Sequence, residues 1–186
     1  MRTDRRALLM MDLQNGIVER FADTPSVMAP VQSALAAARA AGILVIFVRV
    51  AFRDGYPEVS PLNKSFVGIS SRGGFTQSDH ATQVHASLSP AADEPIVTKL
   101  RVSAFAGSDL ELILRSQNVN TLILTGIATS GVVLSTLREA ADKDYKLVVL
   151  SDACLDSDPE VHRVLTEKVF PRQADVLTVA EWSATL

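Results

Sequence analysis

Residues 122–154 decide the fold; they are LILTGIATSGVVLSTLREAADKDYKLVVLSDAC. Their pattern predicts a strand, an amphipathic helix and a second strand, at 120–126, 129–145 and 146–150. Within the helix, Val133, Leu137 and Ala140 fall on one face, as in a helix that packs against a sheet. The stretch therefore predicts a β-α-β unit, in which the two strands are parallel and the helix crosses between them.

The alternation of strand and helix continues on both sides of this unit. Residues 43–49, ILVIFVR, are apolar on both faces, which is typical of a central parallel strand covered by helices on each side. Further strands are predicted at 6–12, 95–99 and 175–177, and helices at 27–42, at 108–116 and from Asp158 onward. Six strands separated by helices predict an α/β protein with a three-layer α/β/α, Rossmann-like architecture around a mainly parallel sheet.

Composition and charge exclude several classes of protein. The chain has 186 residues, 47% hydrophobic and 21% charged, with a net charge of −3, as in globular proteins rather than disordered or fibrous ones. We expect one domain spanning 1–186. The longest apolar run, 43–48, is too short for a membrane helix, so we expect a cytoplasmic protein without a membrane partner. Scattered basic residues offer no continuous positive face, so nucleic acid is not an expected partner.

One long segment, 51–93, interrupts the alternation. It is rich in Gly, Ser and Pro, and only a short helix is predicted in it, near 81–88. A segment of this length without periodicity inside a compact domain is usually a lid or a binding loop. It leaves the carboxyl end of the strand at 43–49, at the edge where α/β folds bind ligands. We therefore predict that 51–93 is a lid insertion beside a site.

Two charged residues end predicted strands. Asp12 follows the first strand and Lys99 ends the strand at 95–99. Each has an ordinary explanation, Asp12 as a turn residue and Lys99 as a solvated strand end. Taken together, they are expected at the carboxyl ends of neighbouring strands, within reach of an ion pair that could serve acid–base chemistry.

The segment 126–133, GIATSGVV, joins a strand to a helix. The N-terminus of a helix leaves backbone N–H groups without intrahelical partners, and these can hold a carboxylate or a developing oxyanion. We predict that the N–H groups around Ala128 and Val132 form such a site. The glycines match neither the dinucleotide fingerprint nor a Walker loop, so nucleotide binding is not predicted.

These motifs resemble one known family. The stretches LLMMDLQNGI at 8–17, IVTKLRVSAF at 96–105 and the opening stretch 122–154 are similar to the isochorismatase-like hydrolases, also called the cysteine hydrolase superfamily. The resemblance implies the fold of that family and catalytic roles for Asp12 and Lys99. It places the family's nucleophilic cysteine at the position of Val132, and it implies a cis peptide bond between Ile127 and Ala128.

Valine has no nucleophilic atom, so the covalent thioester route of the family's amidases cannot run through position 132. The resemblance still implies an acid–base route in which Asp12 protonates the substrate before water attacks. Two alternatives stay open: an amidase that uses another nucleophile or activated water, and a non-catalytic binding protein. Cys154, the single cysteine, is expected to pack as a small buried hydrophobe rather than to act as a displaced nucleophile.

We expect the substrate to be a small anionic, carboxylated molecule. The basic residues proposed to hold it are Arg53 in the lid and Arg101, which strand alternation would place on the same face as Lys99. Tyr56 and Phe66 are proposed to cover its apolar part. The three histidines show no ligand spacing, so no metal and no cofactor are predicted. The resemblance implies a homo-oligomer, a dimer or a tetramer.

Overall fold

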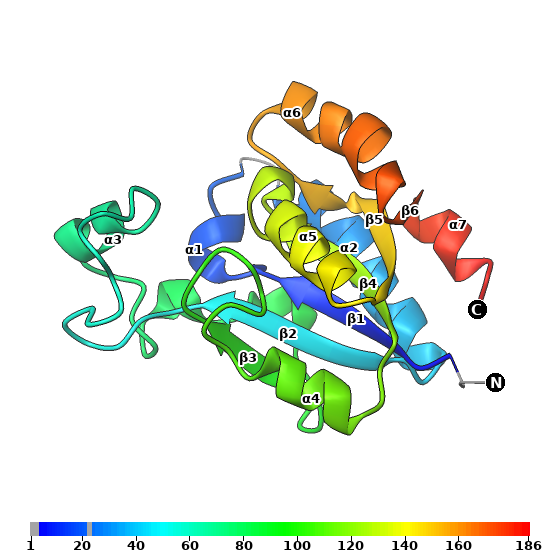
Figure 1. Cartoon of the computed structure of the whole chain (residues 1–186), viewed down its shortest axis with the longest axis horizontal. Helices are drawn as coiled ribbons and strands as arrows, with labels where there is room; N and C mark the ends of the chain where they lie inside the picture. The colour runs from blue at the N-terminus through cyan, green and yellow to red at the C-terminus, as the bar shows by residue number, and fades with distance from the viewer. Residues whose placement is uncertain (1–3, 22–23) are drawn as a thin grey trace.

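A parallel sheet forms the centre of the computed structural model, which describes residues 4–21 and 24–186 (Figure 1). Its six strands lie in the order β3-β2-β1-β4-β5-β6, and every neighbouring pair is parallel. The strands are β1 (Arg6–Met11), β2 (Leu44–Val50), β3 (Ile96–Lys99), β4 (Thr121–Ile127), β5 (Lys146–Leu155) and β6 (Asp175–Leu177). The predicted α/β fold is confirmed.

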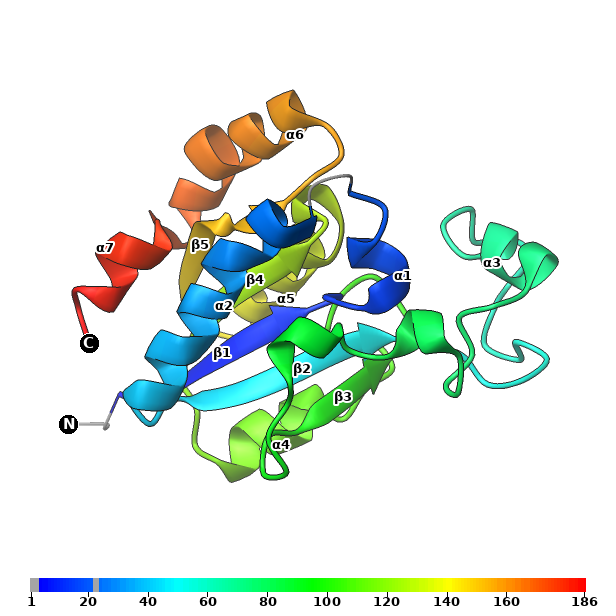
Figure 2. The ribbon, with the colours of Figure 1, turned by 180° about the vertical axis from the view of Figure 1, so that it is seen from behind.

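Helices cover both faces of the sheet. Helices α2 (Thr24–Ala40) and α7 (Val179–Ser183) pack together on one face, and α4 (Leu110–Ser116) and α5 (Leu134–Asp142) lie on the other (Figures 1 and 2). Two hydrophobic cores result, one on each side. Burial of both faces explains why the strand at 43–49 is apolar throughout rather than alternating.

Strand β1 distributes its side chains between the two cores. Leu8 and Met10 join the cluster under α2, whereas Leu9 and Met11 join the cluster under α4 and α5. All four are at most 1% exposed. Because successive side chains of a strand point to opposite faces, this apolar run fixes β1 in the middle of the sheet.

The order of the strands corrects one prediction. Asp12 and Lys99 were expected at the ends of neighbouring strands, but β2 lies between β1 and β3. The two residues still meet at the carboxyl edge, because all of these strands point the same way. Local sequence pattern does not encode strand order, which depends on how the crossover helices pack.

Several elements differ from the predicted boundaries. The predicted helix at 129–145 begins as a single π-helical turn, and the predicted strand at 146–150 continues to Leu155 past an irregularity in its pairing with β4. The short helices α1, α3 and α7 were not predicted, because fewer than two turns show no periodicity. None of the helices in the described ranges is long and apolar enough to cross a bilayer.

The remaining elements are α1 (Asn15–Val18), α3 (Val67–Arg72), η1 (His80–Thr82), η2 (Ala86–Leu88), η3 (Thr129–Val133), α6 (Pro159–Val164), η4 (Leu165–Val169) and η5 (Phe170–Arg172).

Part of the predicted lid is an arm, residues 53–75, that projects from the sheet and carries α3 (Figures 1 and 2). The arm begins and ends side by side, because Phe52 pairs with Thr76. Its base has a small core of its own around Phe52 and Phe66. Leu62, within the arm, is 91% exposed. The predicted helix near 81–88 is replaced by the two short turns η1 and η2 at the arm's return to the body.

Candidate active site

Asp12 lies at the carboxyl edge of the sheet, directly after strand β1. The residue follows directly after Met11 with a φ of 55°, and its N–H donates to the Val48 carbonyl at 2.8 Å. On the other side of β1, a Cβ atom on Gly126 would lie 2.2 Å from the Met11 carbonyl oxygen, so this close approach of β4 requires glycine. The end of β1 is therefore held tightly between its two neighbours.

Asp12 pairs with Lys99 across the end of β2. Lys99 is the last residue of β3, and its Nζ lies 3.0 Å from Asp12 Oδ2. The exposed fraction is 6% for Asp12 and 2% for Lys99. The prediction that the two side chains come within ion-pair reach is confirmed, and the pair is almost completely shielded from water.

The two oxygens of Asp12 have different surroundings. Oδ2 faces Lys99, whose Nζ also donates to the Arg101 carbonyl at 3.0 Å, whereas Oδ1 is buried without a hydrogen-bond partner among the described residues. Burial raises the pKa of Asp12 above its usual value of 3.8, although the charge and hydrogen bond of Lys99 oppose the rise. Asp12 therefore keeps its proton to a higher pH than an exposed aspartate, and it has one oxygen free for another partner.

We expect wild-type protein to lose stability relative to the Asp12→Asn variant as the pH rises above 3.8. Because the pKa of Asp12 is raised in the folded state, that state binds more protons than the unfolded state in this range, and the free energy of unfolding then falls with increasing pH. The variant has no titrating group at this position. Urea unfolding of both proteins at pH values below and above 3.8 measures the difference between their free energies of unfolding. If the wild type instead gains stability relative to the variant as the pH rises, the pKa of Asp12 is not raised.

Gln14 anchors the loop that follows Asp12. Its fully buried side-chain amide donates to the carbonyl oxygens of Val50 and Thr82 at 2.9 and 3.0 Å and accepts the Val50 N–H at 2.8 Å. Sequence reasoning did not single out Gln14, and its one signal is an amide side chain shortly after the apolar run that ends at Met11. Its three hydrogen bonds hold the Asp12 loop against the ends of β2 and η1.

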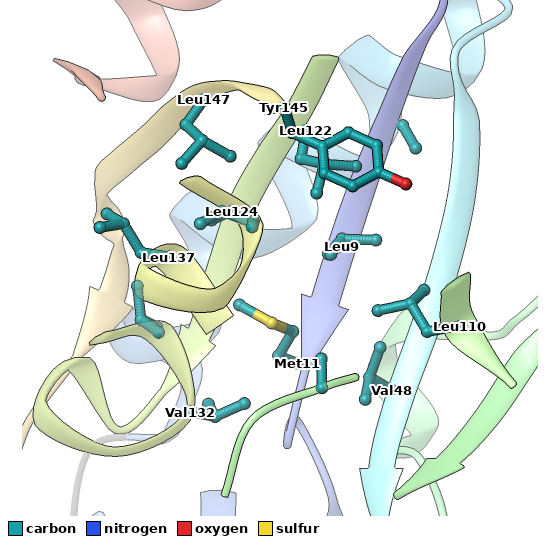
Figure 3. Packing of buried hydrophobic residues seen from close by; sticks show 14 of the residues in the cluster. Leu9, Met11, Val48, Leu110, Leu122, Leu124, Val132, Leu137, Tyr145 and Leu147 are labelled. Atoms are coloured by element: carbon teal, nitrogen blue, oxygen red, sulfur yellow. The ribbon is translucent and has the colours of Figure 1, made fainter. Parts of the chain in front are cut away.

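The η3 turn follows β4 after a cis peptide bond between Ile127 and Ala128. The cis bond implied by the family resemblance is thus present. Val132 is 2% exposed and belongs to the same apolar cluster as Met11 and Val48, the residues that flank the Asp12 loop (Figure 3). At this position the site has a packed hydrocarbon side chain and no nucleophile.

Part of the expected anion site at η3 is occupied by the chain itself. The Ser130 N–H donates to Asp156 Oδ2 at 2.7 Å, and the N–H groups of Gly131 and Val133 donate to the Ala128 carbonyl at 3.1 and 3.3 Å. Burial raises the pKa of Asp156, but the hydrogen bonds from Ser130, Asp158 and Ser157 together outweigh burial, so that its pKa is lowered and the carboxylate stays ionised. A carboxylate of the protein thus lies at one of the donors where a ligand anion was predicted. The role of the Ala128 and Val132 N–H groups stays a prediction.

The predicted arginines lie at the base of the arm. Arg53 forms an ion pair with Glu58, and the guanidinium of Arg101 donates to the carbonyl oxygens of Leu100 and Glu58 at 2.6 and 2.9 Å. The predicted strand alternation from Lys99 to Arg101 is wrong, because β3 ends at Lys99 and the chain then bends. Both arginines are held near Glu58, and their contact with a ligand stays a prediction.

The predicted aromatic residues also lie on the arm. The Tyr56 hydroxyl donates to the Gly74 carbonyl at 2.8 Å. Phe66 is 7% exposed and packs edge-on against Phe52, with ring centroids 5.5 Å apart. Both side chains stabilise the arm in this structure, and their role in covering a substrate stays a prediction.

The histidines are separated and have neutral partners. His80 is hydrogen-bonded to Asn15 at 3.1 Å, the His85 ring to the Ser87 hydroxyl at 2.8 Å, and His162 to Thr129 at 2.8 Å. Among residues 4–21 and 24–186, no three His, Cys, Asp or Glu side chains lie together as metal ligands. Asp12 and Lys99 are the ionisable pair that the structure brings together at the carboxyl ends of β1 and β3.

A family model described as "Isochorismatase domain" matches residues 6–181. The chain belongs to the isochorismatase family. It is 34% identical to ureidoacrylate amidohydrolase RutB of Stutzerimonas stutzeri over 187 residues, which cover 86% of this chain and 73% of that one. It is also 34% identical to the isochorismatase family protein YecD of Escherichia coli O157:H7, covering 94% and 93% of the two chains.

Solved structures agree with this assignment. An isochorismatase family protein from Burkholderia thailandensis superimposes with a TM-score of 0.85 at 30% identity, covering 97% of this chain and 95% of that one. The similarity thus extends over the sheet, both helical layers and the Asp12 edge. The protein is a hydrolase of the isochorismatase family.

The only cysteine of this isochorismatase-family hydrolase is Cys154. It lies in β5 opposite Gly126, is 4% exposed, and its Sγ is 3.8 Å from the Leu124 carbonyl oxygen. Burial raises the pKa of its thiol to about 12. Because the thiolate is the reactive form, Cys154 is poorly suited to be a nucleophile.

We expect iodoacetamide to leave native protein unmodified and its turnover unchanged. The thiol is both buried and almost fully protonated at neutral pH, so alkylation requires unfolding. Intact-mass measurement should show no adduct in buffer and one adduct in urea. Labelling that parallels loss of activity and that substrate prevents would instead make Cys154 catalytic.

Proposed function

We propose that this hydrolase cleaves a small anionic metabolite by proton transfer at Asp12, assisted by Lys99, without a covalent thioester. The observation that supports this most directly is the buried Asp12–Lys99 pair, 3.0 Å apart, in which Asp12 Oδ1 is unpartnered and the carboxyl pKa is raised. Val132 removes the nucleophile from the position where the family resemblance places it, so water must attack the substrate directly.

The reaction uses Asp12 in two protonation states. The neutral carboxyl donates its proton from Oδ1 to the substrate, which makes the carbon atom of the scissile bond electrophilic, and the carboxylate left behind is stabilised by the Lys99 ammonium at Oδ2. Water then adds to that carbon and gives one proton to Asp12, which restores the starting state. The bond from the carbon to the leaving group breaks, and the leaving group departs with the bonding electron pair and the proton of the new hydroxyl group. In a site this dry, the charge on Lys99 acts more strongly than it would in water. The net reaction consumes one water molecule and cleaves one bond.

An anionic substrate fits the groups around this edge of the sheet. The N–H groups of Ala128 and Val132 and the guanidinium groups of Arg53 and Arg101 are the donors proposed to hold its carboxylate, with Tyr56 and Phe66 beside its apolar part. The RutB relative is named for ureidoacrylate, a carboxylate-bearing molecule, which is consistent with this class. The arginines would have to share their donors with Glu58 and the backbone.

Amide hydrolysis with activated water is a second candidate, favoured by the amidohydrolase name of the same relative. In that case the ionised form of Asp12 accepts a proton from water, which then attacks the amide carbon. The two routes need opposite protonation states of Asp12. Turnover by the acid route should fall as the pH rises through the pKa of Asp12, whereas turnover by the base route should rise.

The experiment that tests the proposal is a substrate panel of carboxylated vinyl ethers, amides and esters, each with a matched neutral analogue. We expect hydrolysis of an anionic member, no hydroxamate when hydroxylamine is added, and unchanged turnover in a Cys154→Ala control. Hydroxylamine trapping of an acyl group would show covalent catalysis. Binding of panel members without turnover of any would mean a non-catalytic binding protein and would overturn the proposal.

A further inference from the structure

The η3 turn is joined to helix α6 by a hydrogen bond between two side chains. Thr129 Oγ1 lies 2.8 Å from His162 Nδ1, although the residues are 33 positions apart in the chain. Thr129 is fully buried and His162 is half-buried. The bond therefore links the first residue of η3 to α6, which follows β5 in the chain and packs beside η3.

A second contact joins the same two regions one residue later. The Ser130 N–H donates to Asp156 Oδ2, and the other oxygen of Asp156 accepts the Asp158 N–H at 3.3 Å. Asp158 in turn caps α6 by accepting the N–H groups of Glu160 and Val161. Asp156, in the segment between β5 and α6, is thus itself fixed by hydrogen bonds where it contacts η3.

The η3 turn has no side-chain cap of its own. The residue before it is Ala128, which has no side chain that can accept a hydrogen bond, whereas helix starts usually have Ser, Thr, Asp or Asn at this position. The first N–H groups of a helical turn otherwise have no partner. Asp156 supplies such an acceptor, for the Ser130 N–H, whereas His162 holds the side chain of Thr129.

We propose that His162 and Asp156 are positioning residues that fix the conformation of η3 and, through it, the location of Val132 and the N–H groups of the turn. His162 acts through Thr129, which is too deeply buried to contact a substrate. The stabilisation of η3 by these two residues does not depend on any reaction. Its effect on turnover rests on the proposed function.

Matched variants separate the hydrogen bond from the bulk of each side chain. His162→Phe keeps a ring but removes the bond to Thr129, whereas His162→Asn places an amide group where Nδ1 lies. Thr129→Val and Thr129→Ser form the corresponding pair. Amide hydrogen exchange across η3, measured by mass spectrometry on the full-length protein, is the primary measurement because it needs no substrate.

We expect His162→Phe and Thr129→Val each to speed exchange of the η3 amides about tenfold, the factor that loss of one hydrogen bond supports. Exchange in β1 and β4 should be unchanged. His162→Asn and Thr129→Ser should stay near wild type, and the Phe/Val double variant should be no faster than either single one. Unchanged exchange in His162→Phe, equal effects of Asn and Phe, or additive single effects would each overturn the proposal.

Turnover provides a second, separate measurement. On a substrate identified from the panel, we expect KM to rise in His162→Phe with little change in kcat, and His162→Asn to restore it, because the N–H groups of the turn are proposed to hold the carboxylate of the bound substrate. If kcat falls in His162→Asn while the η3 amides still exchange as slowly as in the wild type, His162 acts as an acid or base through Nε2 and is not a positioning residue. If no panel member is hydrolysed, the exchange result still decides the structural role.

Discussion

Asp12→Asn should lower kcat by about 10²–10⁴-fold, the range that a positioned general acid or base contributes. Asparagine has nearly the shape of aspartate but cannot donate or accept the proton, so binding should change much less than turnover. Asp12 Oδ1 is the one oxygen of the buried pair without a partner, which makes it the atom that we expect to face the substrate. Steady-state kinetics on a panel substrate measures the loss.

Asp93→Asn is the matched control, because Asp93 is an exposed aspartate. It precedes the first residue of β3, whereas Lys99 is the last residue of that strand. Its kcat should equal that of the wild type. Circular dichroism and a bound, non-hydrolysed analogue should show that Asp12→Asn remains folded and able to bind. If folded Asp12→Asn keeps more than about a tenth of wild-type kcat, the proton-transfer role of Asp12 is wrong.

Lys99→Met should lower the free energy of unfolding by about 3–5 kcal/mol, the usual cost of leaving one member of a buried ion pair without its partner. Lys99 is 2% exposed and Asp12 6%, so water cannot replace the lost ammonium. The effect should shrink at acidic pH, where Asp12 takes up a proton and its buried charge disappears. Urea unfolding at neutral and acidic pH measures both changes.

The double variant Asp12→Asn/Lys99→Met should recover most of this stability, because neither member of the pair is then left charged and buried. Arg163→Met is the control for loss of a surface pair, because Arg163 contacts Glu160 in α6 and Glu167 in η4 at the protein surface, and we expect little change in stability. A Lys99→Met variant that is destabilised by about 1 kcal/mol or less would show that the pair is effectively solvated.

The sequence by itself determined the layers of this protein and the meeting of Asp12 with Lys99. Apolar runs such as 43–49 identify buried parallel strands, and the placement of Asp12 and Lys99 directly after such runs predicts the edge at which they meet. Burial on both faces is encoded within the few residues of each strand, and the parallel direction follows from the helix that connects successive strands. The resemblance to isochorismatase-like hydrolases, carried by longer stretches, added position 132 and the cis peptide bond.

Only the tertiary structure decided which groups surround those residues. Gln14 meets Val50 across 36 positions of the chain, Ser130 meets Asp156 across 26, and Thr129 meets His162 across 33. No periodicity marks such pairs, because each is set by the order β3-β2-β1-β4-β5-β6 and by the packing of α6 beside η3. The raised pKa of Asp12 has the same origin, because a carboxyl group is desolvated by the tertiary packing around it, and Lys99, which opposes the rise, reaches Asp12 from β3.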